Sequence, residues 1–264
     1  MEKSKTSVTL VECAILIAMA FVLGFIKIID MPYGGSVTAA SMVPIIIAGY
    51  RHGLKWGLIT GFAFSLLQLL TGLESVSYAT SSTAAVAIIM LDYIVAFTVL
   101  GLLGIFKRNR HQTGVLISGA FVVCFLRFIC HVITGCTVWA GVSIPTADGA
   151  VYSIVYNASY MIPETVVTLY VIALLSNAVD LRLDRPVTKK KSKKVMAVLN
   201  GVLVFGIAIL IDFLYLFRQI QTSEGFDITR IANADWMFIG IVTAAGAGIG
   251  AVAYIVTKMI AARK

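Results

Sequence analysis

Residues 130–164 bring together polar and aromatic side chains in a chain that is otherwise mostly apolar. Lipid solvates none of these polar groups, so they need partners inside the protein. Imidazole, indole, phenol and carboxamide groups can stack on a flat ligand and form hydrogen bonds with its edge. We therefore expect the segment to line a binding site for a small polar, aromatic ligand. Its members of this kind are His131, Trp139, Tyr152, Asn157 and Glu164.

Asp92 adds a carboxylate from another apolar segment, AIIMLDYIVAFTVLG. An unpaired carboxylate inside a membrane is unfavourable by at least about 3 kcal/mol. It either meets a cationic or hydrogen-bond-donating ligand or forms a structural ion pair with Arg127. Because Tyr93 follows it and residues 131–157 offer a pocket, the ligand-binding interpretation is favoured.

Trp139 lies eight residues after His131, with Gly135 midway. On a continuous helix the two rings share one broad face. Gly135 and Pro145 instead predict that the helix ends between them, which places Trp139 on an outer loop. A Trp at this depth either touches the ligand or only anchors the chain at the membrane interface.

Asn157 and Glu164 are seven residues apart and share a helical face, with Pro163 predicted to kink the helix between them. Asn157 fits a ligand contact or a hydrogen bond between helices. Glu164 is expected to be structural, accepting hydrogen bonds from backbone amides that the kink frees.

The composition indicates an all-α, polytopic membrane protein without a large soluble domain. Hydrophobic residues make up 59% of the 264 residues and charged residues 13%, with a mean hydropathy of +0.94. A soluble domain carries about 25% charged residues. The net charge of +8 is concentrated beside apolar segments, which indicates topology and contact with a lipid bilayer, not binding to nucleic acid.

Eight apolar segments account for the chain. The second is short and contains Pro44, so it is expected to be tilted, partly re-entrant or sheltered by its neighbours. MEKSKTSVTL is interpreted as leading into the first span, not as a removed signal peptide. The expected segments are 8–29, 36–50, 56–72, 82–106, 113–136, 151–176, 195–217 and 237–258.

The positive charges predict that both termini are cytoplasmic. With that orientation, 17 of the 21 Lys and Arg residues lie in or beside the inside connections, and only Arg218 and Arg230 lie outside. This bias follows the positive-inside rule and requires an even number of spans. The inside connections are 1–7, 51–55, 107–112, 177–194 and 259–264.

A basic linker, 181–194, divides a six-helix core, 1–180, from a two-helix hairpin, 195–264. The linker is interrupted by Pro186 and is predicted to be a flexible tether near anionic lipid. In the hairpin, Gly246 and Gly250 form a face suited to internal packing, and Asp212 is expected to pair locally near Arg218 or to reach the outer interface. Deletion of 181–264 is expected to spare ligand binding.

Motifs for catalysis and nucleotide binding are missing from the sequence. It contains no Gly-Lys dipeptide, hence no Walker A loop, and no GxSxG element. Its four Cys form no CxxC pair, and its three His form no HExxH motif. We therefore expect no enzyme activity, no bound metal and no cofactor.

Four motifs carry a resemblance to a known family. They are LDYIVAF, RFICHVITGCTVW, the Tyr and Asn five residues apart in VYSIVYNASYMIPE, and an Ala-xxx-Ala pair in the first span. Over about residues 8–177 the chain resembles the thiamine-binding S component of energy-coupling factor (ECF) vitamin transporters. The resemblance implies a ligand site made of Phe64, Asp92, Tyr93, His131, Trp139, Tyr152 and Asn157, and a docking face for the transmembrane coupling (T) subunit at Ala14 and Ala18.

The chain departs from the family pattern at several positions. Asp92 replaces a Glu, Phe64 replaces a Trp expected in the third span, and the first outer loop offers Tyr33 in place of a Trp. The two C-terminal spans have no counterpart in the six-helix fold.

The resemblance implies capture of thiamine outside the cell under a cover formed by residues 31–36. Trp139 and His131 would stack on the ligand, Tyr152 and Asn157 would bind its edge, and Asp92 would face the thiazolium cation. A T subunit with two ATPases would then drive inward delivery, so only partner subunits would hydrolyse ATP. The alternative is a self-sufficient, proton-coupled transporter of thiamine or a precursor, in which Asp92 or Glu164 would titrate.

Overall fold

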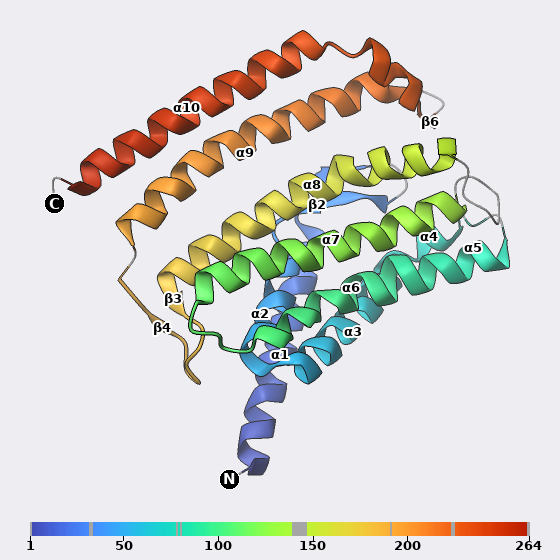
Figure 1. Cartoon of the computed structure of the whole chain (residues 1–264). Helices are drawn as coiled ribbons and strands as arrows, with labels where there is room; N and C mark the ends of the chain where they lie inside the picture. Colours follow the sequence, from blue (N-terminus) through green and yellow to red (C-terminus); the bar gives the residue numbers. More distant parts are fainter. Residues whose placement is uncertain are drawn as a thin grey trace.

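The computed structural model describes residues 2–31, 34–77, 79, 81–138, 147–190, 192–222 and 225–262. Within them, seven helical segments are long and apolar enough to cross a membrane, which confirms the all-α, polytopic fold (Figure 1). These segments are α1 (Glu2–Phe25), α3 (Leu54–Thr71), the composite α5–η2–α6–η3 (Ser82–Ala87, Ile88–Val95, Ala96–Thr98, Val99–Phe106), α7 (Gln112–Val138), α8 (Ala147–Ala178), α9 (Lys193–Ile220) and α10 (Trp236–Ala262).

Short elements connect these helices. In the described part of the chain, three antiparallel strand pairs are β1 (Lys27–Asp30) with β2 (Ser36–Thr38), β3 (Val179–Asp180) with β4 (Val187–Thr188), and β5 (Gln221–Thr222) with β6 (Gly225–Phe226). The same residues also form the shorter helices α2 (Met42–His52), α4 (Leu73–Ser77) and η4 (Ile228–Asn233).

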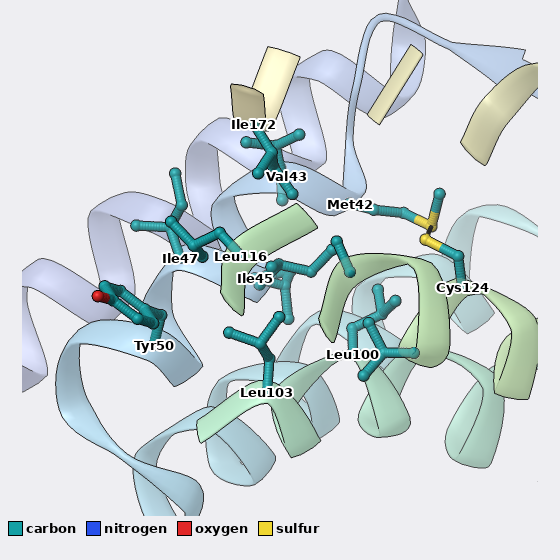
Figure 2. Packing of buried hydrophobic residues seen from close by; sticks show 14 of the residues in the cluster. Met42, Val43, Ile45, Ile47, Tyr50, Leu100, Leu103, Leu116, Cys124 and Ile172 are labelled. Atoms are coloured by element: carbon teal, nitrogen blue, oxygen red, sulfur yellow. Dashed lines mark hydrogen bonds between the residues drawn. The ribbon is translucent and has the colours of Figure 1, made fainter. Parts of the chain in front are cut away.

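The second expected span, 36–50, is shorter than predicted because its first residues form β2. The helix α2 has 11 residues and is about 16 Å long, roughly half the thickness of a hydrocarbon core. All of its residues except His52 are buried. Figure 2 shows Met42, Ile45 and Tyr50 of α2 packed with Leu100 and Leu103 of η3. The expectation that neighbouring helices shelter this segment is therefore confirmed.

Arg51 holds the start of the basic linker against the core. Its guanidinium is buried, forms an ion pair with Glu12 of α1, and donates hydrogen bonds to the carbonyl oxygens of Leu181, Leu183 and Asp184. The predicted flexible tether is therefore bonded to the core over its first residues. We call this end of the bundle, where 51–55, 107–112 and 181–194 lie, the basic end.

Neighbouring charges reinforce the same segment. Arg108 donates to the Asp184 carboxylate at 2.6 Å and to the Arg51 carbonyl oxygen at 3.0 Å. The Arg182 guanidinium, hydrogen-bonded to Asp180, lowers the pKa of that carboxyl group to about 2. Asp180 is therefore ionised at neutral pH, and its bond to Arg182 persists there.

Replacing Arg51 with Met is expected to lower the free energy of unfolding by about 3 kcal/mol or more, because three carbonyl oxygens and Glu12 lose a buried cationic partner. Arg110, whose side chain is exposed at the same end, provides the matched control Arg110→Met. Thermal unfolding in detergent measures both variants. Equal melting temperatures for the two would contradict this role of Arg51.

The C-terminal hairpin packs along one side of the core. Figure 1 shows α7, α8, α9 and α10 in succession, and α9 contacts α8 as well as α10. The predicted small-residue face is confirmed, since Gly250 lies against Gly201 and Gly246 against Ala208.

Asp212 pairs across the hairpin. It is buried and accepts a hydrogen bond from Thr243 Oγ1 of α10 at 2.5 Å. Its partner is thus on the neighbouring helix of the hairpin, which agrees with the expected pairing inside the protein. A polar bond inside an apolar hairpin favours one packing register of the two helices.

Candidate ligand-binding site

A cavity of about 330 Å³ lies at the end of the core opposite the basic end. Its wall is built by the last turns of α1 and α3, the β1–β2 hairpin, α4, η2, α7 and α8. The volume is in the range of pockets that hold small molecules. The polar side chains on which the argument below depends are Thr38, Asp92, Tyr93, Arg127, His131, Tyr160 and Glu164.

Asp92, His131 and Arg127 form a chain of hydrogen bonds in the cavity wall. Asp92 Oδ1 lies 2.8 Å from His131 Nδ1, and Arg127 Nε donates to His131 Nε2 at 3.2 Å. Because a guanidinium only donates, Nε2 must accept, which places the proton of a neutral imidazole on Nδ1, facing the carboxylate. His131 thus separates the two charged groups, and the direct Asp92–Arg127 pair left open by the sequence is not formed.

The fourth span is π-helical where it carries Asp92 and Tyr93, over Ile88–Val95. Such turns are rare and frequently occur at functional sites. A wider turn reduces the angle between successive side chains, so these two neighbours both reach the cavity. Tyr93 also donates a hydrogen bond to the Gly72 carbonyl oxygen at 2.7 Å, which joins η2 to the end of α3.

Asn157 lies one layer behind the cavity wall. Its Nδ2 donates to the carbonyl oxygens of His131 at 3.2 Å and Ser153 at 2.9 Å, and its Oδ1 accepts from the Tyr160 hydroxyl at 2.7 Å. The bond from α8 to α7 is the helix–helix contact that the sequence left open. Tyr160, three residues further on the same helical face, is the residue that lines the cavity.

Tyr152 also lies behind the wall, in a cluster around Tyr156 and Tyr160. Its ring is parallel to that of Tyr156, with centroids 6.4 Å apart. The Tyr156 hydroxyl in turn accepts a hydrogen bond from the Gly35 amide at 3.3 Å. A row of tyrosines on α8 therefore supports residues 34–36, which line the cavity.

Glu164 connects α8 to the β1–β2 hairpin. Its two carboxylate oxygens accept hydrogen bonds from the Thr38 amide at 2.5 Å and the Thr38 hydroxyl at 2.7 Å. Both donors belong to Thr38 of β2. The sequence analysis predicted backbone amides freed beside Pro163 as donors, and that prediction is wrong. Glu164 is buried in the cavity wall and holds the hairpin in place.

Phe64 and Trp139 complete the set of expected site residues. Phe64 is fully buried, and its ring meets that of Phe97 edge to face with centroids 5.3 Å apart. Phe97 lines the cavity, so Phe64 lies one layer behind it. Trp139 is outside the described residues, as are Pro32 and Tyr33 of the expected cover.

Ala14 and Ala18 lie on an exposed face of α1. Neighbours on the same side include Val11, Ile15 and Val22, which are 55%, 55% and 60% exposed. The opposite side of α1 packs on the core through Cys13 and Ala20. The structure therefore leaves the small-residue pair accessible to another helix.

Comparison with known proteins gives consistent matches. The family described as thiamine transporter protein (Thia_YuaJ) matches residues 10–182, more than half of the chain. The thiamine transporter ThiT of Bacillus subtilis (strain 168) is 33% identical over 187 residues, covering 66% of this chain and 93% of that protein. ThiT of Lacticaseibacillus paracasei is 26% identical over 192 residues, covering 66% and 90%.

The family match covers the core and ends before the hairpin. The family match stops at residue 182, so α9 and α10 are additional to it. The membrane-crossing helices and the bacterial relatives identify a multi-pass protein of the bacterial cell membrane, and those relatives are named as transporters. The chain belongs to the thiamine transporter protein family.

Proposed function

We propose that this chain is the thiamine-binding S component of an ECF transporter, capturing thiamine in the cavity and delivering it inward with an ATP-driven coupling module. One observation carries the proposal. The family's acid-Tyr and His motifs meet at a single cavity, where Asp92, Tyr93 and His131 form part of the wall.

The chemistry of the cavity suits a flat cation. The Asp92 side chain is 27% exposed and lies in a largely apolar bundle, where its charge is screened less than in water. Hydrogen bonds with Arg127 and Asp92 engage both ring nitrogens of His131, which leaves ring stacking as the contact that its side chain can make with a ligand. We assign stacking to His131 and Trp139, and the neighbourhood of the thiazolium to Asp92.

Delivery requires partners. The exposed Ala14 and Ala18 face allows a helix of a T subunit to approach α1 closely. The sequence has no Walker A loop, so two ATPase subunits bound to the T subunit would supply the energy.

Two experiments test the proposal. Calorimetry of the purified protein is expected to show binding of thiamine, with thiamine phosphate and the isolated aminopyrimidine as comparisons that define the ligand. Uptake by cells is expected to stop when the ATPases are removed. Uptake that persists without them and follows the proton gradient would support the secondary-transporter alternative and overturn the coupling proposal.

Replacing Asn157 with Ala is expected to weaken thiamine binding by about tenfold or more. The change removes the acceptor of the Tyr160 hydroxyl and the bond to the His131 carbonyl, so two residues of the wall lose their support. Calorimetry measures the dissociation constant. Asn200, which bonds to Thr257 within the C-terminal hairpin, provides a matched control, since Asn200→Ala is expected to leave binding unchanged.

A further inference from the structure

We propose that the C-terminal hairpin contributes to thiamine binding. Phe217 of α9 is a positioning residue that supports Tyr156 and Tyr160 of α8 and the β1–β2 hairpin, and thereby slows the release of thiamine. The inference rests on the proposed function. It assigns a role to the two helices that lie beyond the family match, so deletion of 181–264, which the sequence alone predicted to spare binding, is instead expected to speed release.

Phe217 packs against a cluster that backs the cavity. The cluster contains Tyr156 and Tyr160 of α8 and Met31 and Val37, which flank residues 32–36. Among the described residues, Phe217 is the residue of the C-terminal hairpin that packs against this cluster. One aromatic ring of α9 therefore contacts the apolar surface shared by the cavity wall and the β1–β2 hairpin.

The cluster is connected directly to residues that line the cavity. The Gly35 amide donates to the Tyr156 hydroxyl, and a Cβ on Gly35 would lie only 2.8 Å from the Tyr160 ring. Residues 34–36 thus lie directly on the two tyrosines. Any movement of the tyrosines away from the cavity removes the surface on which this segment rests.

The linker just before α9 and the middle of α9 are held against α8, so the helix can hold Phe217 in place. At the basic end, the Ser192 amide donates to Asn177 Oδ1 at 3.1 Å, and the Lys189 amide to the Ala178 carbonyl oxygen at 2.9 Å. Midway along the helix, a Cβ on Gly206 would lie 3.1 Å from Val166 of α8. The side chain that reaches the tyrosine cluster follows about three helical turns later.

The test compares release rates in variants of the full chain. Radiolabelled thiamine bound to each purified protein is chased with an excess of unlabelled thiamine. Phe217→Ala is expected to release thiamine about fivefold faster or more, with little change in the association rate. Phe217→Tyr keeps the aromatic ring and is expected to release thiamine as slowly as the unaltered chain. Leu214→Ala, at a position on the same helix that is 39% exposed, is the matched control and is expected to behave as the unaltered chain.

A purely structural role for Phe217 would lower the melting temperature without changing the release rate at a temperature where all variants are folded. Release of thiamine by Phe217→Ala at the unaltered rate overturns the inference alone. If the Ala variant does not fold, the release rate of Phe217→Leu is measured in its place, because Leu keeps most of the apolar volume. Absence of thiamine binding by the unaltered chain overturns the proposed function, and the inference with it.

Discussion

Replacing Asp92 with Asn is expected to weaken thiamine binding by about 100-fold, or about 2.7 kcal/mol. Asn is nearly isosteric and its carbonyl oxygen can still accept the hydrogen bond from His131 Nδ1, so the wall keeps its shape. What is lost is the negative charge opposite the thiazolium. Calorimetry at constant ionic strength measures the change.

Asp92→Glu is the control for this charge. It retains the carboxylate, so binding is expected to stay within about threefold of the unaltered chain. Asp92→Asn binding with unaltered affinity would show that the thiazolium lies elsewhere. Loss of affinity in both variants would point to the geometry of the Asp92–His131 contact and not to its charge.

Replacing Gly135 with Ala is expected to reduce thiamine binding by about tenfold or more. A Cβ at this position would lie 2.2 Å from Ser153 Oγ and 3.3 Å from Asn157 Nδ2, so either the Ser153 side chain must turn aside or α7 and α8 must separate. Ser153 Oγ donates to the Val132 carbonyl oxygen and accepts from Asn157, and either movement breaks both bonds. These hydrogen bonds are therefore lost about one helical turn from His131.

The same helix supplies the control and the rescue. Gly114 also lies in α7, and a Cβ there would meet no atom within 4 Å, so Gly114→Ala is expected to bind thiamine normally. The double variant Gly135→Ala with Ser153→Gly removes the atoms that would collide and is expected to recover part of the affinity. Equal affinities for the two single Ala variants would contradict the proposed close contact.

The membrane character of the chain could be predicted because it depends on composition and charge alone. Hydropathy places the long helices, and the cluster of Arg51, Arg108 and Arg182 marks one end of the bundle. The start of the second span could not be predicted, because Ser36–Thr38 forms a strand only through its pairing with Lys27–Asp30. Which membrane face the basic end occupies stays a prediction.

The candidate site was predictable where its motifs are local in sequence. Asp92, Tyr93 and His131 are recognised by type and spacing, and all three line the cavity. Tyr160 could have been inferred as a neighbour of Asn157 on the same face of α8. Thr38 gave no local signal, because its partner Glu164 is 126 residues away in the chain.

The order of the helices has a consequence for assembly. Contacts from α9 to the core are made chiefly with α8, whereas Ala14 and Ala18 face outward from α1. Two helices therefore extend the core covered by the family match without closing the flank on which the proposed coupling subunit would dock. The added hairpin therefore leaves the Ala14 and Ala18 side of α1 accessible to another helix.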